Sequence, residues 1–165
     1  MELVSTPANP VPPGASVFAV TAKDGARLRA ARWSPGAGGG RGSVLLLQGR
    51  SEFIEKYYEA IAELLQRGLD VVAFDWRGQG GSQRLLSNPR KGHVRRFSDY
   101  QADLNAVLKQ AMAGQAPEPW FALAHSMGGA ILIAQSRAGR SPFSRIVTTA
   151  PMIDLQGLRL PQLWP

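Results

Sequence analysis

The sequence has no cysteine, and this absence excludes several kinds of chemistry. Disulfides, thiolate metal sites and a cysteine nucleophile all need the thiol group, so covalent catalysis would have to use Ser, Thr, Lys or a carboxylate. Histidine is scarce as well, with two residues among 165. We expect no metal and no other cofactor.

Long apolar runs are also missing. No run approaches the roughly 18–20 residues of a membrane span, and the Pro-rich start, Met1–Ser16, lacks the apolar region of a signal peptide. With 44% hydrophobic and 19% charged residues, the composition is that of a globular domain with a real core. We therefore expect a single cytoplasmic domain.

The net charge is +7, from 19 Lys and Arg against 12 Asp and Glu. The basic residues are mostly single arginines spread along the chain, so we expect no nucleic-acid partner. One stretch, Arg84–Arg96, has five basic residues and no acid. Two interpretations of it stay open: a solvated loop, or a peripheral contact with an anionic lipid or phosphate group at the inner membrane.

Apolar patterning predicts an alternation of strands and helices. Residues 1–15 read as a flexible Pro-rich arm, and the segments around the turn Lys23-Asp24-Gly25 as a β-hairpin. Continuous apolar runs predict buried strands, and three- and four-residue spacing predicts helices. The expected strands are 16–21, 26–33, 44–47, 70–76, 120–124 and 146–149, and the expected helices are 52–67, one beginning at 98, and 130–138.

A hairpin followed by such an alternation predicts an α/β fold with a mostly parallel sheet and helices on both faces. We expect the partial domain to occupy residues 16–154. Residues 155–165 show no periodicity.

The strongest chemical signal is Ser126, which lies directly between a predicted strand and a predicted helix. A sharp strand-to-helix turn needs small residues two before and two after the nucleophile, and Ala124 and Gly128 meet that demand. The amide of Met127 would lie at the helix N-terminus, where it can stabilise an oxyanion. The plainer interpretation is a small-residue turn with an incidental serine.

A second oxyanion donor is expected from the loop after an earlier core strand. That loop is 48–52, in which Gly49 lets the backbone approach the substrate and the Arg50 N–H is the candidate donor. The alternative is an ordinary glycine turn with an arginine in solvent. Asp75, at the end of another strand, is expected to bond to local backbone groups, and Asp99 and Asp103 are expected to be first-turn helix acids.

Six motifs occur in the order found in one enzyme family. They are Leu46-Leu47-Gln48-Gly49-Arg50-Ser51-Glu52-Phe53, Tyr57-Tyr58, Phe74-Asp75-Trp76-Arg77-Gly78-Gln79-Gly80-Gly81-Ser82, Phe97-Ser98-Asp99-Tyr100, His125-Ser126-Met127-Gly128-Gly129 and Ala150-Pro151-Met152. Together they resemble the lysophospholipase and monoacylglycerol lipase branch of the α/β-hydrolases, the serine aminopeptidase S33 type. Two positions depart from the family pattern: Gln48 replaces the usual His, and Ala124 the usual Gly.

The resemblance implies a serine hydrolase of lysophospholipids, monoacylglycerols or similar carboxylic esters. Its nucleophile would be Ser126, and its oxyanion hole the amides of Arg50 and Met127. The family places its acid and base after the nucleophile, but only Asp154 follows Ser126 here and no histidine does. We therefore expect the N-terminal part of such a fold, ending before the C-terminal strands, with 155–165 as the start of the lid or a truncated tail.

Three residues are weak substitutes for the missing acid and base. His125 adjoins the nucleophile and is expected to be buried and structural, His93 to lie on the surface, and Asp154 to enter the lid. The alternative function is an inactive hydrolase fragment that serves as a lipid-binding or interaction module. An open sheet edge would then favour self-association.

Overall fold

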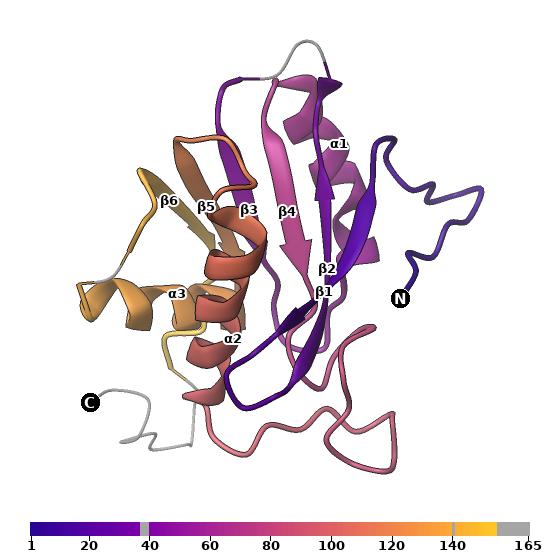
Figure 1. Ribbon diagram of the computed structural model, residues 1–165. Coiled ribbons are helices and arrows are strands. Elements are labelled where there is room, and N and C mark those ends of the chain that lie inside the picture. The colour runs from indigo at the N-terminus through magenta and orange to yellow at the C-terminus, as the bar shows by residue number, and fades with distance from the viewer. Residues whose placement is uncertain (37–39, 140, 155–165) are drawn as a thin grey trace.

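We analysed a computed structural model of the chain, which describes residues 1–36, 40–139 and 141–154 (Figure 1). The tail expected at 155–165 lies outside the described residues. The described elements, in chain order, are β1 (Ser16–Thr21), β2 (Arg27–Trp33), β3 (Ser43–Leu47), the 3-10 helix η2 (Ile54–Tyr57), α1 (Tyr58–Gln66), β4 (Asp70–Phe74), α2 (Asp99–Val107), the π-helical turn η3 (Leu108–Met112), β5 (Trp120–His125), α3 (Met127–Arg137) and β6 (Arg145–Thr149).

The described strands form one sheet in the order β1-β2-β4-β3-β5-β6. The β1–β2 and β2–β4 pairs are antiparallel, whereas β4, β3, β5 and β6 run parallel. The predicted α/β architecture, with its hairpin and parallel strands, is therefore confirmed. Because parallel strands end at one edge, the loops after β3, β4 and β5 meet at that edge.

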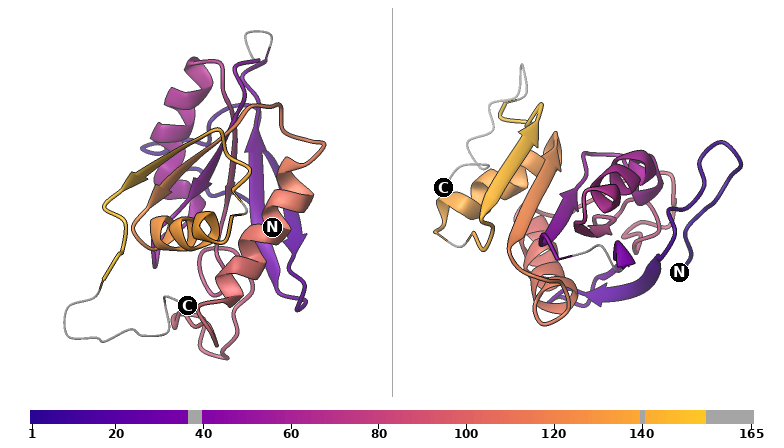
Figure 2. Two further views of the ribbon diagram at one scale, coloured as in Figure 1. Left: turned by 90° about the vertical axis from the view of Figure 1, so that its left-hand side faces the viewer. Right: turned by 90° about the horizontal axis from the view of Figure 1, so that it is seen from above.

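Helices cover both faces of the sheet, as predicted, and they follow the alternation of side chains along the strands (Figure 2). On β3, Leu46 packs in the cluster that includes Ile54 of η2 and Ile61 of α1. Its neighbours Leu45 and Leu47 instead belong to the cluster that contains α2 and α3. The central strands are buried on both faces, which explains their continuous apolar sequences.

The edge strand β6 is covered least. Ile146 and Val147 point to opposite faces, and their exposed fractions are 37% and 56%. Among the described residues, β6 pairs with β5 alone. This matches the open edge expected from the sequence.

The N-terminal arm lies against the body. The Arg29 guanidinium donates to the Glu2 carbonyl at 2.7 Å, the Val4 amide to Glu55 Oε1 at 3.2 Å, and the Trp33 indole to the Pro12 carbonyl at 3.1 Å. The flexibility expected for residues 1–15 stays a prediction. These contacts are the ones that would have to break for the arm to move.

Candidate active site

Ser126 has a backbone conformation that few non-glycine residues adopt. It lies between β5 and α3 with φ 49° and ψ −115°, a strained geometry that costs about 1–3 kcal/mol. Its amide donates to the Thr149 carbonyl at 3.1 Å, and its carbonyl accepts from the amides of Met152 at 3.0 Å and Ala130 at 3.2 Å. The end of β6 and the first turn of α3 therefore hold the strained residue in place.

Gly128 must lack a side chain because the oxyanion loop candidate packs against it. A Cβ at Gly128 would lie 2.3 Å from the Leu47 carbonyl oxygen and 2.7 Å from that of Gln48. A Cβ at Gly129 would lie 2.9 Å from Cβ of Pro151. The start of α3 is thus in contact with the end of β3, which brings the backbone after Ser126 to the loop that contains Arg50.

Helix α3 begins at Met127, three residues before the predicted start at Ala130. Glycine disfavours a helix interior, so the propensity of Gly128 and Gly129 opposes this earlier start. Packing against β3 and Pro151 overrides that preference. As a result the Met127 amide lies in the first helical turn, where backbone N–H groups have no intrahelical acceptor.

The loop after β3 uses two of its amides to hold its own shape. The Gly49 amide donates to Glu52 Oε2 at 2.7 Å, and the Ser51 amide donates to Gln79 Oε1 at 2.9 Å. Gly49 therefore helps to shape the loop, and the Arg50 N–H, between two bonded amides, has no acceptor among the described residues.

Glu52 is the carboxylate that holds this loop. It accepts from the Tyr57 hydroxyl at 2.6 Å and pairs with Lys56 at 2.8 Å, besides bonding to Gly49. Burial alone would raise the pKa of Glu52, but the hydrogen bonds from Lys56, Tyr57 and the Gly49 amide lower it below its usual value. Burial and the Glu52 charge raise the pKa of Tyr57, so its hydroxyl stays a donor.

Asp75 joins the loop after β3 to the turn after β4. Its Oδ1 accepts from Gln48 Nε2 at 3.0 Å and from the Ile54 amide at 2.9 Å. Its Oδ2 accepts from Arg29 Nε at 2.6 Å and from the Gly81 amide at 2.7 Å. The carboxylate is fully buried and has a structural role, as expected, but its partners reach well beyond its own turn.

Behind Asp75 lies an ion pair that the sequence did not reveal. The Arg29 guanidinium donates to both oxygens of Glu55, at 2.7 Å each. Burial raises the pKa of Glu55, the hydrogen bonds from Arg29 lower it, and the net result is a pKa below the usual value. Both side chains are buried.

Gln48, at the position where the resembled family has His, is bonded on two sides. Its Nε2 also donates to the Phe74 carbonyl at 2.5 Å, and its own carbonyl accepts from the Trp76 indole at 2.9 Å. Its Oε1 is buried without a partner among the described residues. Gln48 therefore attaches the loop after β3 to the end of β4.

The expectation for Asp103 was wrong. Asp103 lies beyond the first turn of α2, is fully buried, and accepts from Arg77 Nε at 2.9 Å and Nη2 at 2.7 Å. Arg77 also pairs with Asp24 in the hairpin turn at 2.6 Å. The arginine thus joins the hairpin to α2, a long-range contact that helix position alone does not predict.

Neither histidine bonds to the Ser126 hydroxyl. His125 is half-buried, less than expected, and its Nδ1 lies 2.9 Å from Thr149 Oγ1. His93 is exposed on the loop before α2, and its backbone lies against Gly78. Asp154 is exposed. The structure thus brings together Ser126, Met127 and the loop of Gly49 and Arg50, but adds no histidine to them.

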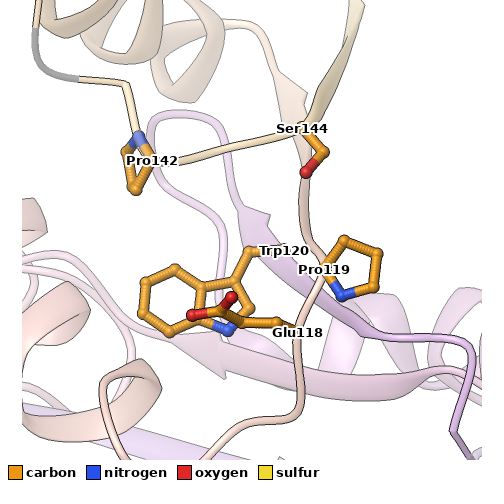
Figure 3. Close-up of a pocket in the computed structure, with 5 residues that line it drawn as sticks. All are labelled: Glu118, Pro119, Trp120, Pro142 and Ser144. Atoms are coloured by element: carbon orange, nitrogen blue, oxygen red, sulfur yellow. The ribbon is translucent and has the colours of Figure 1, made fainter.

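Two cavities lie away from Ser126. One, of about 410 Å³, is lined by Glu118, Pro119, Trp120, Pro142 and Ser144 (Figure 3). It lies near the amino ends of β5 and β6, whereas Ser126 follows the carboxyl end of β5. The other, of about 450 Å³, lies behind the loop after β3, beside Phe53 and the Arg29–Glu55 pair. In the described part of the chain, no group of three or more His, Asp or Glu side chains could hold a metal ion.

Known proteins resemble the chain over most of its length. The sequence model of the family described as "Serine aminopeptidase, S33" matches residues 39–164. Lysophospholipase L2 of Escherichia coli strain K12 is 42% identical over 121 residues, which cover 72% of this chain and 34% of that protein. Monoacylglycerol lipase of Mycolicibacterium smegmatis is 29% identical over 114 residues, which cover 69% of this chain and 39% of that protein.

Solved structures agree on the fold. An esterase from Exiguobacterium antarcticum superposes with a TM-score of 0.67 at 20% identity, over 84% of this chain and 46% of its own. An α/β-hydrolase from Novosphingobium aromaticivorans gives 0.64 at 21% identity, over 82% of this chain and 44% of its own. The chain thus spans a third to a half of the length of the relatives it matches.

Proposed function

The chain belongs to the serine aminopeptidase S33 family of α/β-hydrolases, and we propose that it is the nucleophile-bearing part of a serine hydrolase that acts on carboxylic esters of lipids. The observation that carries the proposal is the backbone of Ser126, with φ 49° between β5 and α3. A fold retains such strain where a side chain must be presented in one position. Here the side chain is a hydroxyl.

In the proposed reaction, Ser126 Oγ attacks the ester carbonyl carbon and the carbonyl oxygen becomes an oxyanion. The amides of Arg50 and Met127 donate to that oxygen, the alcohol leaves with a proton, and water then hydrolyses the acyl-enzyme. Gly49 lets the loop backbone approach the substrate, and its amide fixes the loop by donating to Glu52. One oxyanion donor of this kind is worth about 10²–10³ in turnover.

The substrate class rests on the names of the relatives. A lysophospholipase and a monoacylglycerol lipase are both similar to this chain. We propose lysophospholipids, monoacylglycerols or related acyl esters as substrates. Their shared chemistry is one acyl chain on a glycerol ester, which a single nucleophile and oxyanion hole can process.

The general base is proposed to come from polypeptide beyond these 165 residues. His125 is engaged with Thr149, and His93 lies on an exposed loop. Neither side chain accepts the Ser126 proton in the described geometry. Without a base, only about 10³–10⁴ over the uncatalysed rate is expected to remain.

A second candidate, favoured by the same geometry, is a non-catalytic module that binds lipid or another copy of the chain. The unpartnered nucleophile and the exposed Ile146 and Val147 of β6 support it. The two candidates differ in whether Ser126 is chemically competent. They are distinguished by covalent labelling, which needs one attack and no turnover.

The test is labelling by a fluorophosphonate with and without added imidazole, which supplies the missing base. We expect mass spectrometry to find the label on Ser126, at a rate that rises with imidazole, and no label on that peptide in Ser126→Ala. Ser98→Ala, which changes an exposed serine whose side chain makes no capping bond, should label like the parent chain. Labelling that imidazole does not accelerate would favour the non-catalytic module.

A further inference from the structure

The loop between β4 and α2 carries a cluster of unpaired positive charge. We define the cationic loop as residues 84–96, in which Arg90, Lys91, Arg95 and Arg96 are exposed. The segment contains no Asp or Glu. Within the described residues, none of these four side chains has an ion-pair partner. Their charges therefore face solvent without compensation.

The cationic loop is fixed to the body at several points. The Arg84 guanidinium donates to the carbonyl of Gly80 at 2.9 Å and to that of Gly78. Val94 packs against the core, and within the loop the amide of Lys91 donates to the Asn88 carbonyl at 3.2 Å. The four charges are thus carried by an anchored segment, which presents them from a defined place on the surface.

That place is the end of the sheet that holds Ser126. The cationic loop runs along the edge at which β3, β4 and β5 end (Figure 1). The backbone of His93 lies against Gly78, directly after β4. Phe97, which follows the loop, lies 5.6 Å from Tyr100 between ring centres, and Arg50 of the oxyanion loop interacts with Tyr100. Arg50 is exposed and adds its own charge beside the loop.

The nearest carboxylates are already engaged. Asp99 accepts from the Arg96 amide at 3.2 Å and lies 3.8 Å from the Arg77 guanidinium. Asp24 and Asp103 pair with Arg77 as well. These three carboxylates carry two more charges than Arg77 neutralises. The four exposed cations of the cationic loop outnumber that remainder, so its net charge stays positive.

The apolar content of the loop favours lipid over nucleic acid. Leu86 is 40% exposed among the cations, and residues 84–96 include no Phe, Tyr or Trp on which a base could stack. Basic side chains with an exposed leucine are the combination that binds at an anionic lipid surface. We propose that the cationic loop binds the anionic phospholipid surface of a membrane and so turns the Ser126 end of the sheet towards it.

This inference rests on the proposed function, because a lipid ester is the substrate that a membrane would supply. The test avoids catalysis by using the Ser126→Ala chain. Its co-sedimentation with vesicles is compared between phosphatidylcholine alone and equal parts of phosphatidylcholine and phosphatidylglycerol. We expect binding to the anionic vesicles only, weakening as salt is added, because exposed charges are screened.

The decisive variant is Lys91→Gln/Arg95→Gln/Arg96→Gln. Each basic residue near an anionic surface contributes about a factor of five in binding, so the triple variant should bind roughly 100-fold more weakly. The matched control is Arg41→Gln/Arg67→Gln/Arg145→Gln, which removes the same charge from exposed positions before β3, before β4 and at the start of β6, at the opposite end of the sheet. The control should retain most of the binding.

Equal losses in the two triple variants would overturn the proposal, since binding would then follow net charge alone. Binding to pure phosphatidylcholine, or tighter binding to duplex DNA than to the anionic vesicles, would also overturn it. Vesicle binding that depends on the loop, in a chain whose Ser126 takes no label, would keep this inference while removing the proposed function. Circular dichroism of each variant confirms that the fold is intact.

Discussion

At the scale of single residues, Gly128 is a position that leaves no room for a side chain. A side chain there would meet two backbone carbonyls, those of Leu47 and Gln48, and backbone cannot rotate away as a side chain can. We expect Gly128→Ala to lower the free energy of unfolding by about 2–4 kcal/mol, measured by urea denaturation.

Gly92→Ala provides the comparison for that substitution. The nearest atom to a Cβ at Gly92 is the Gly78 carbonyl oxygen at 3.6 Å, an ordinary contact. Its free energy of unfolding should stay within about 0.5 kcal/mol of the parent chain. Similar losses at both positions would mean that packing between α3 and the end of β3 is not what demands a glycine.

Asp75 is the second sensitive residue, because four donors converge on its carboxylate. Asn at this position would turn an amide NH₂ group towards donors and leave Arg29 with one carboxylate partner instead of two. Breaking a buried charged network of this kind costs about 3–5 kcal/mol. Urea denaturation of Asp75→Asn should show a loss of that size.

An exposed ion pair is the control for Asp75→Asn. Arg67 and Glu63 are more than half exposed, and pairs in water contribute little. Glu63→Gln should change the free energy of unfolding by no more than about 0.5 kcal/mol. If Asp75→Asn were equally mild, the loop after β3 would be held by something other than this carboxylate.

At the scale of elements, the loop after β3 is stabilised by carboxylates that must be ionised. The pKa values of Glu52 and Glu55 lie below the ordinary glutamate value in the folded chain. Their contribution to stability is therefore present above the unfolded pKa of about 4.3 and is lost as the pH falls through the lower folded values. Urea midpoints should be steady from pH 7 to about pH 5 and fall at lower pH.

Glu52→Gln isolates the part of that decline that belongs to the loop. Glutamine cannot release a proton, so the fall in stability below pH 5 should be shallower than in the parent chain, starting from a lower value at pH 7. An unchanged slope in Glu52→Gln would show that other carboxylates cause the acid sensitivity.

The elements that the sequence predicted best are those set by local rules. Strands β3 and β4 consist mainly of continuous apolar runs and are buried on both faces, and the elbow at Ser126 needs small residues at a fixed spacing. The Arg29, Glu55 and Asp75 network could not be predicted in this way. Its members are 26 and 46 residues apart, and nothing in their local sequence distinguishes buried from exposed charges.

At the scale of the whole molecule, the open edge of the sheet has a measurable consequence. Strand β6 exposes Ile146 and Val147, and unpaired edges with apolar side chains promote association. We expect the chain to self-associate as its concentration rises, and Val147→Lys to shift it towards the monomer in sedimentation velocity. Val4→Lys, which changes an equally exposed residue of the N-terminal arm, should leave the association unchanged, and a similar shift in it would point to a different interface.

The hydrogen bonds between Ser126 and the residues at and after the end of β6 also determine when, during synthesis of the chain, the backbone of Ser126 can be held in place. The Ser126 amide and carbonyl are held by Thr149 and Met152, which leave the ribosome well after the serine does. A nascent chain arrested before β6 would already contain Ser126 and α3, yet of the three backbone hydrogen bonds of Ser126 only the one from the Ala130 amide could hold the strained backbone. Ser126 is therefore translated before the residues that complete the support of its backbone.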